Sequence, residues 1–265
     1  LLFFLIRLEK LLLGTPWPII LLVLAVLAWL GSRSWKLALG SVVAFMLIGY
    51  FGMWKDKLRK LPLVAILRGI SLDKVQPVAQ VLYHSGFRAL EIPMNSERAV
   101  ESIGLCIREF GTDMLVGAGT VLDVEEVKKV EQVGCQFAVS PNVDASVIKA
   151  TKKTKMISVP GVSTPSEAFM ALASGADALK IFPAELVTPT ILKAWRAVLP
   201  KDIWLVPVGG IRPDLLGSYW SAGANAFGLG SALFKADFSI TEIRDRSLTF
   251  VDHYESDCKK GDQEN

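Results

Sequence analysis

One lysine in this sequence stands where lysines are rarely found. Lys180 lies in the segment ALKIFP, residues 178–183, where every neighbour is apolar. Lysine is almost never fully buried unless it is paired or functional. Burial removes the solvation of an ammonium group and lowers its pKa, so that the amine becomes a nucleophile able to form a Schiff base. A structural ion pair inside the fold is the alternative interpretation.

A carboxylate and a guanidinium stand at the ends of two other apolar segments. Glu91 lies in ALEIPM, residues 89–94, and is placed to act as a general acid/base or to pair with Arg68 or Lys180. Arg68 ends LVAILR, residues 63–68, and its planar fork suits a carboxylate or a phosphate. An arginine in that position is, taken alone, often only a surface residue.

Small residues close three further segments. Gly209 and Gly210 end WLVPVGG, and Gly230 and Ser231 lie in AFGLGSALF. Glycines let backbone N–H groups approach an anion closely, although tight turns alone would also explain them. Thr120 follows GAG and offers a hydroxyl beside open space, with simple packing as the alternative.

These residues belong to a repeating pattern of apolar runs and amphipathic stretches. Several stretches open with Ser, Thr or Asp and close on Gly, as helices do. Eight such units, with runs apolar on both faces, predict an α/β fold of the (β/α)8 barrel type. No GxGxxG follows the first run, which disfavours a doubly wound sheet. The predicted strands lie in residues 63–68, 89–94, 115–121, 137–141, 156–161, 178–183, 204–210 and 226–234.

Barrel enzymes carry their active sites at the carboxyl ends of the strands, and often bind phosphate after strands seven and eight. The pattern therefore predicts one site built from the residues at these ends. They are Arg68, Glu91, Thr120, Pro141, Gly161, Lys180, Gly209, Gly210, Gly230 and Ser231.

Composition excludes several other classes of protein. The 265 residues carry a net charge of +3, but residues 1–60 contribute 8 − 2 = +6 and residues 61–265 contribute 21 − 24 = −3. The basic balance is therefore confined to the N-terminal part and indicates no nucleic-acid surface. Three scattered cysteines argue against a disulfide framework or zinc ribbon and fit a reducing compartment. His84 and His253 lie far from the strand ends and are interpreted as non-catalytic.

The N-terminal part differs in kind from the rest. Residues 15–31 and 37–54 are uncharged and each is long enough to span a bilayer as a helix. They predict a transmembrane hairpin in a domain of residues 1–56, followed by the barrel in residues 57–265. The flanking positive charges place the barrel on the cytoplasmic side. A pair of buried core helices is the alternative. The hairpin resembles the start of a glycine betaine/proline ABC transporter permease, which implies no transport activity because the rest of a permease is absent.

The barrel part resembles a known enzyme family from Leu61 to His253. The motifs LVAILRGI, EIPMNS, VGAGTVL, GCQFAVSPN, PGVSTPSEAF, ALKIFPAE, VPVGGI and GLGSALF are similar to those of the class I 2-keto-3-deoxy-6-phosphogluconate/galactonate aldolases. The motifs EIPMNS and VSPN are more similar to those of the phosphogalactonate members of the family. The resemblance implies retro-aldol cleavage of 2-dehydro-3-deoxy-6-phosphogalactonate to pyruvate and glyceraldehyde 3-phosphate.

The same resemblance implies a role for each site residue. Lys180 would form the Schiff base, and Glu91 would move protons through a water molecule. Binding of the pyruvate carboxylate would fall to Arg68 and Thr120, and packing on the pyruvyl group to Phe182. The remaining positions would shape the pocket, at Pro141 and Gly161, or bind phosphate, at Gly209, Gly210, Gly230 and Ser231.

The family also implies a homotrimer. It implies that no metal and no other cofactor is needed, because the iminium is the electron sink.

Other functions stay open at this point. They are cleavage of the phosphogluconate epimer, isomerisation of a sugar phosphate without a Schiff base, and a catalytically silent sugar-phosphate-binding barrel joined to a membrane segment.

Overall fold

The computed structural model describes residues 26, 29, 34, 36 and 54–259. The chain divides into two compact units, Leu1–Asp56 and Lys57–Asn265. The predicted hairpin over residues 15–54 falls almost entirely outside the described residues. Among those that are described, no helix is long and apolar enough to cross a membrane.

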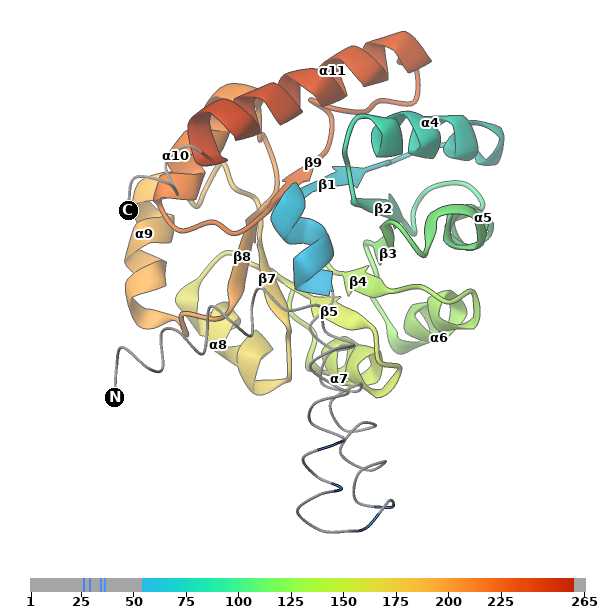
Figure 1. Ribbon diagram of the computed structural model, residues 1–265. Coiled ribbons are helices and arrows are strands. Elements are labelled where there is room, and N and C mark those ends of the chain that lie inside the picture. Colours follow the sequence, from blue (N-terminus) through green and yellow to red (C-terminus); the bar gives the residue numbers. More distant parts are fainter. Residues whose placement is uncertain (1–25, 27–28, 30–33, 35, 37–53, 260–265) are drawn as a thin grey trace. The chain divides into compact units, whose positions relative to one another are not determined.

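The second unit alternates strands with helices from β1 to α11 (Figure 1). All strand pairs are parallel. The strands are β1 (Leu63–Ile66), β2 (Ala89–Pro93), β3 (Leu115–Gly119), β4 (Phe137–Val139), β5 (Ile157–Val159), β6 (Gly161–Val162), β7 (Ala178–Ile181), β8 (Trp204–Pro207) and β9 (Phe227–Leu229).

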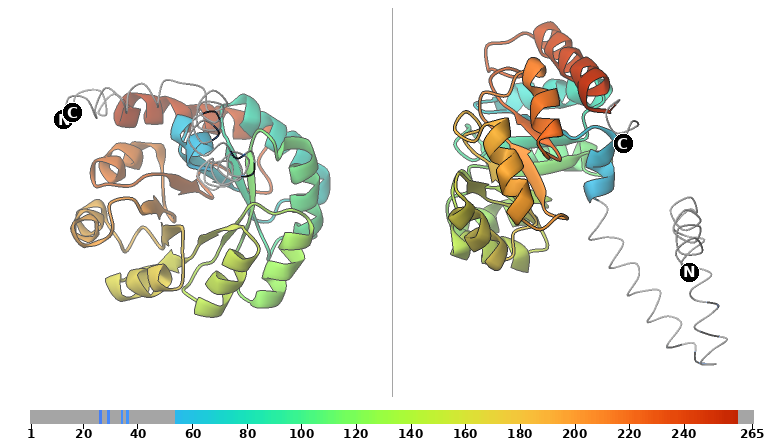
Figure 2. Two further views of the ribbon diagram at one scale, coloured as in Figure 1. Left: turned by 60° about the horizontal axis from the view of Figure 1, so that its bottom comes forward. Right: turned by 90° about the vertical axis from the view of Figure 1, so that its left-hand side faces the viewer.

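Helices follow the strands and form the outer layer around them (Figure 2). They are α4 (Leu72–His84), α5 (Ala99–Phe110), α6 (Val124–Gln132), α7 (Ala145–Lys153), α8 (Pro165–Ala173), α9 (Pro189–Val198), α10 (Leu216–Ser221) after the short 3₁₀ turn Pro213–Leu215, and α11 (Ile240–His253), which runs into the π-helical segment Tyr254–Lys259.

Helix starts agree with the capping residues read from the sequence. The side chains of Asp123, Asp144 and Ser239 each accept a hydrogen bond from a backbone N–H in the first turn of α6, α7 or α11. Thr164 and Glu167 form a complete capping box at the start of α8. These local signals explain why the helix positions could be predicted.

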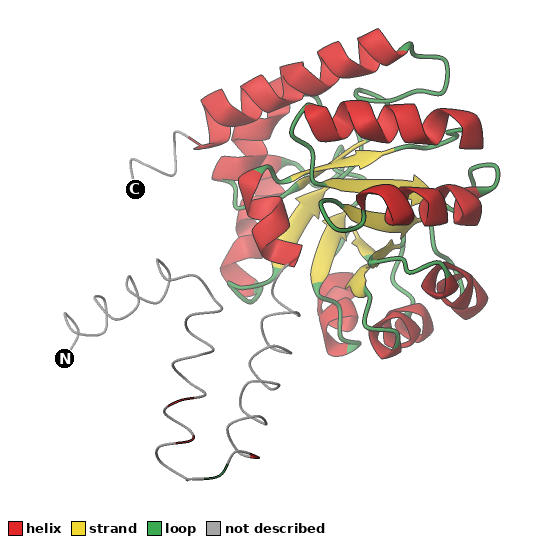
Figure 3. Cartoon of the chain, turned by 45° about the vertical axis from the view of Figure 1, so that its right-hand side comes forward, coloured by secondary structure: helices red, strands yellow, loops and turns green. Residues whose placement is uncertain are grey.

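Two hydrogen-bonded sheets make up the ring of strands. One has the order β5-β4-β3-β2-β1-β9 and the other β6-β7-β8. An isolated parallel bridge between Val208 and Gly228 joins β8 to β9. The backbone N–H of Lys180 donates to the Pro160 carbonyl over 2.9 Å, which joins β7 to the β5–β6 segment. Figure 3 shows the strands enclosed by the helices. The fold is thus an α/β barrel of parallel strands.

The fifth predicted strand differs from expectation because a proline divides it. Residues 156–161 form β5 and β6, with Pro160 between them. Proline has no N–H to donate to a ladder, so pairing stops there. Because β5 and β6 together fill the fifth position of the barrel, each later strand label is one higher than its barrel position. The strands β8 and β9 thus occupy the seventh and eighth positions.

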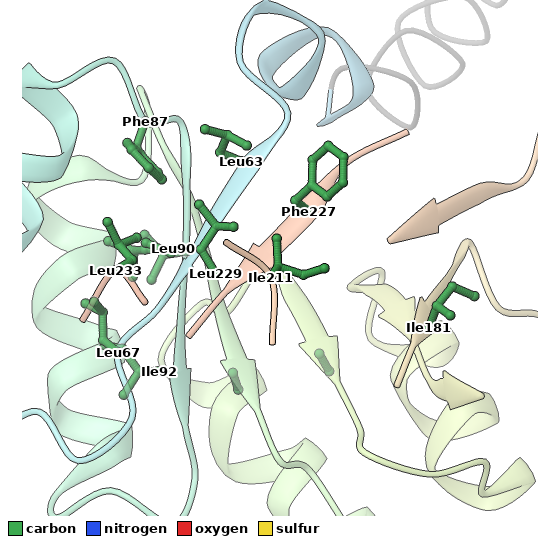
Figure 4. Close-up of a cluster of buried hydrophobic side chains, with 14 of the residues drawn as sticks. Leu63, Leu67, Phe87, Leu90, Ile92, Ile181, Ile211, Phe227, Leu229 and Leu233 are labelled. Carbon is green, nitrogen blue, oxygen red and sulfur yellow. The ribbon is translucent and has the colours of Figure 1, made fainter. Parts of the chain in front are cut away.

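Apolar side chains fill the space between the strands and the helices. Figure 4 shows Leu63, Phe87, Leu90 and Phe227 in this core, and each is almost fully buried. Such burial from both faces is what parallel strands require. Cys106 and Cys135 are buried too, and burial raises the pKa of each thiol to about 12, so both behave as small apolar residues.

Candidate active site

The Lys180 side chain lies inside the barrel, in the middle of β7. It is only 3% exposed, and its Nζ lies 4.7 Å from the centre of the Phe182 ring. Burial lowers the pKa of its ammonium group; the Glu91 carboxylate opposes that shift, and Arg68 adds to it. The amine is therefore more readily available as a neutral nucleophile than an exposed lysine is.

Glu91 lies deeper than the sequence suggested. It is the third residue of the five-residue strand β2, not the last, and it is 2% exposed. Burial raises the pKa of its carboxyl group, while Lys180 and Arg68 lower it. No hydrogen bond from a described residue reaches its buried Oε1 atom. Glu91 can therefore hold a proton that an exposed carboxylate would lose, and one of its oxygens is left to exchange it.

A glycine makes room for this carboxylate. A Cβ atom at Gly119, the last residue of β3, would lie 1.7 Å from Oε1 of Glu91. Thr120 follows with φ 54°, a left-handed backbone that non-glycine residues rarely adopt. The strained turn directs the Thr120 hydroxyl to Arg68, whose Nη2 lies 3.4 Å from Oγ1.

Arg68 lies two residues beyond the end of β1 and holds the loops at this end of the barrel together. Its Nη1 donates to Asn95 Oδ1 over 2.8 Å. Next to it, the N–H of Gly69 donates to Ser96 Oγ over 2.9 Å. Asn95 is a site residue that residue-type reasoning missed, although it stands in the EIPMNS motif.

A cavity of about 410 Å³ opens at the carboxyl ends of the strands. It brings together seven of the eleven residues expected at the site. These are Arg68, Lys180, Phe182, Gly209, Gly210, Gly230 and Ser231. Residue-type reasoning missed six others that line it, because no charge pattern or periodicity marks them. They are Ile66, Val208, Ile211, Arg212, Ala232 and Lys235.

Four expected residues do not line this cavity but support those that do. Glu91 raises the pKa of Lys180, and Thr120 Oγ1 lies near the Arg68 guanidinium. Gly161 pairs with Lys180 across β6 and β7. A Cβ at Gly161 would lie 2.4 Å from the carbonyl oxygen of Pro141, so a glycine is required for these segments to approach. The close approach of Pro141 and Gly161 therefore fixes the position of β7, the strand that carries Lys180.

The glycine pair after β8 meets a carboxylate. Gly209 and Gly210 have φ values of 103° and 62°. Cβ atoms at these positions would lie 2.6 and 2.7 Å from the carboxylate oxygens of Glu185. Glycine is needed here both for the backbone conformation and for this close approach.

The two histidines lie away from the cavity. His84 ends α4, and His253 ends α11, where its Nδ1 lies 3.1 Å from an Asp257 carboxylate oxygen. Within the described part of the chain, no group of three His, Cys, Asp or Glu residues could hold a metal ion.

Comparison with known proteins identifies the family. A sequence profile described as KDPG and KHG aldolase matches residues 54–246. The 2-dehydro-3-deoxy-6-phosphogalactonate aldolase of Escherichia coli is 42% identical over 195 residues, which cover 74% of this chain and 95% of that protein. The chain belongs to the KDPG and KHG aldolase family.

Solved structures agree with this assignment. The aldolase superposes on a native KDPGal structure with a TM-score of 0.74 and 41% identity, covering 76% of this chain and 97% of the other. A Legionella pneumophila KDPG aldolase, described with pyruvate captured as a covalent carbinolamine intermediate, matches with a TM-score of 0.67 and 26% identity over 74% of this chain and 96% of that one. This aldolase is thus a lyase with the barrel fold of its family.

Proposed function

We propose that this aldolase cleaves 2-dehydro-3-deoxy-6-phosphogalactonate to pyruvate and glyceraldehyde 3-phosphate through a Schiff base on Lys180. The observation that carries the proposal is a lysine 3% exposed, within the electrostatic reach of a glutamate 2% exposed, on the wall of a cavity that also holds an arginine. The E. coli relative named for this activity, 42% identical over 95% of its length, supports the substrate.

Bond formation starts at the neutral amine of Lys180. The amine attacks the C2 ketone of the substrate to give a carbinolamine, and loss of water gives an iminium ion. The buried Glu91 carboxyl group can supply, through a water molecule, the proton that lets the hydroxide leave. The raised pKa of Glu91 lets it hold this proton to a higher pH than an exposed carboxyl group would.

Bond cleavage uses the iminium as an electron sink. The carboxylate that Glu91 becomes on giving up its proton takes the proton of the C4 hydroxyl through a water molecule. The C3–C4 bond breaks, and its electron pair becomes the enamine double bond between C2 and C3. Glyceraldehyde 3-phosphate leaves with the new C4 carbonyl. Glu91 returns this proton to C3 of the enamine through a water molecule, and addition of water at C2 then releases pyruvate and restores the Lys180 amine.

Other residues at the carboxyl ends of the strands would bind the substrate. Arg68, oriented by Asn95 and Thr120, would hold the carboxylate at C1. Phe182, with its ring 4.7 Å from Lys180 Nζ, would pack on the pyruvyl carbons. Gly230 and Ser231, with Gly209 and Gly210, would bind the phosphate at C6.

The two C4 epimers of the substrate provide the test of this function. We expect kcat/KM for the galactonate compound to exceed that for the gluconate compound, in line with 42% identity to the E. coli galactonate enzyme and 35% to the Dickeya dadantii gluconate enzyme. Steady-state release of pyruvate from each epimer measures this directly. A preference for the gluconate compound would reassign the substrate, and cleavage of neither would refute the function.

Substitution of Gly230 should weaken recognition of the phosphate selectively. A Cβ at Gly230 meets no atom within 4 Å and needs no unusual backbone angle, so Gly230→Ala is expected to fold normally while its methyl group occupies the cavity. We expect KM for the phosphorylated substrate to rise about tenfold, because hydrogen bonds to a charged group are lost. KM for the unphosphorylated keto-deoxy acid should hardly change.

Gly104→Ala on α5 is the matched control, since it adds a methyl in ordinary contact with Val133, and Gly104 does not line the cavity. Gly210→Val is less informative, because Gly210 has φ 62° and a Cβ there would collide with Glu185. Equal losses on both substrates in Gly230→Ala would indicate damage to the fold instead of to the phosphate site.

The N-terminal segment is proposed as an anchor that leaves the chemistry unchanged. The family match starts at residue 54, and Lys57–Asn265 is a compact unit. A variant that lacks residues 1–56 should therefore keep kcat/KM within about twofold of the full chain, as expected of a separate domain. Loss of activity or precipitation of this variant would show that the removed residues belong to the barrel core.

Membrane fractionation tests the anchor itself. The full chain should need detergent for extraction, with the barrel on the cytoplasmic face, because the spans of residues 15–31 and 37–54 are uncharged and their outer flanks are basic. Recovery of the full chain as a monodisperse protein without detergent would contradict the anchor.

The homotrimer expected of the family stays a prediction, which the mass of the particle in solution tests.

A further inference from the structure

The mouth of the cavity carries more positive charge than the mechanism above uses. Besides Arg68 and Lys180, the side chains of Arg212 and Lys235 line it. None of the described residues that line the cavity is acidic, and the nearby Glu185 carboxylate lies against the backbone of Gly209 and Gly210. Both extra cations come from the loops after β8 and β9, the same loops that carry the glycines of the phosphate site.

The two cations differ in how their charge is compensated. Arg212 forms a two-pronged ion pair with Asp214, with Nε–Oδ1 and Nη2–Oδ2 distances of 3.1 and 2.9 Å. Lys235 has no carboxylate in ion-pair range among the residues that the structure describes, and its Nζ lies 5.4 Å from the Phe238 ring. Lys235 therefore presents an uncompensated charge to the cavity, and Arg212 does not.

The loop that bears Lys235 is held in place from two helices. Arg246 of α11 donates from Nη1 to the Ala232 carbonyl over 3.1 Å, and its guanidinium stacks 4.4 Å from the Phe238 ring. Lys74 of α4 donates to the Ala236 carbonyl over 3.1 Å. Contacts on both sides of Lys235 thus fix its backbone next to Gly230 before any ligand binds.

We propose that Lys235 determines specificity for the phosphorylated substrate by pairing its ammonium with the C6 phosphate. This inference rests on the proposed function and deepens it. A phosphate monoester carries a charge of about −1.5 to −2 at neutral pH. Glycine N–H groups donate hydrogen bonds but bring no net charge, whereas a lysine ammonium is a compact point charge suited to phosphate.

Kinetics of Lys235→Met on two substrates test the inference. KM for the phosphorylated substrate should rise about tenfold, as expected when a charge-assisted hydrogen bond is lost, while kcat is retained. KM for the unphosphorylated acid should not change. Lys235→Arg keeps the charge and should restore most of the affinity. Added salt should raise KM of the unmodified aldolase more than KM of Lys235→Met, because screening weakens the ion pair.

Two variants serve as matched controls. Arg212→Met removes a cation of the same cavity whose charge Asp214 already neutralises, so KM should rise less than in Lys235→Met. Lys193→Met removes an exposed lysine of α9 that does not line the cavity and should leave KM unchanged. An unaltered KM for the phosphorylated substrate in Lys235→Met, or equal increases for both substrates, would overturn the inference.

A binding measurement separates this inference from the proposed function. Glycerol 3-phosphate, titrated calorimetrically into the full-length protein, probes the anion site without turnover. Its Kd should rise about tenfold in Lys235→Met. If the unmodified chain cleaved neither epimer but this loss occurred, the function would fail and the anion site would stand. If cleavage occurred and Kd were the same in both proteins, Lys235 would be excluded and the function would stand.

Discussion

Replacement of Lys180 by methionine is expected to abolish aldol cleavage, with a loss of at least about 10⁴-fold in kcat. Methionine is similar in length and apolar, so it suits a position that is 3% exposed on the buried strand β7. It has no amine, so neither the carbinolamine nor the iminium can form. Pyruvate release measured over hours with concentrated protein would give the residual rate.

The Lys180 result needs proof that the variant is folded. The melting temperature should stay within a few degrees of that of the unmodified aldolase, because the cost of burying an ammonium is removed while the buried Glu91 carboxyl group loses a favourable charge. Lys193→Met, on the exposed face of α9, should retain full activity. A Lys180→Met protein that kept more than about one hundredth of the turnover would show that another group forms the covalent bond.

Replacement of Glu91 by glutamine should have the next largest effect, a fall in kcat of about 10²–10⁴-fold. Glutamine keeps the shape of the side chain against Gly119 but cannot exchange a proton. Schiff-base formation with pyruvate should persist at a lower rate, because the Lys180 amine is still present. Turnover equal to that of the unmodified aldolase would remove Glu91 from the mechanism.

The same variant should change the pH dependence of Lys180. The Glu91 carboxylate raises the pKa of the lysine, and Arg68 lowers it. The reactive form is the neutral amine, which increases as pH rises through that pKa. The midpoint of the pH–rate profile for pyruvate trapping should therefore move to lower pH in Glu91→Gln and to higher pH in Arg68→Met. Shifts in the same direction would contradict this electrostatic account.

Much of the fold could be predicted because its signals are local. Runs such as residues 63–66 are apolar on both faces, as strands of a covered parallel sheet must be. Capping residues such as Asp123 and Thr164 mark where helices begin. Lys180 stood out because a charged residue interrupts an apolar strand, which is visible in the sequence without any knowledge of its neighbours.

Other features depend on contacts between distant segments and could not be read from the sequence. Whether Glu91 ends its strand or lies within it depends on how far β2 pairs with β3, up to Pro93 and Gly119. Arg212 pairs with the Asp214 carboxylate, whereas Lys235 has no such partner among the described residues, and the sequence does not show which of the two cations is paired. Arg68 was predicted, but its partner Asn95 comes from another loop.

Trapping of pyruvate with borohydride on the full-length aldolase, followed by peptide mass mapping, tests the central claim most directly. Borohydride reduces the iminium to a stable secondary amine, so the lysine that forms the Schiff base carries the added three-carbon group. The mechanism predicts one such group per chain, on Lys180. A label on any other lysine, or no label under conditions in which the aldolase turns over, would contradict it.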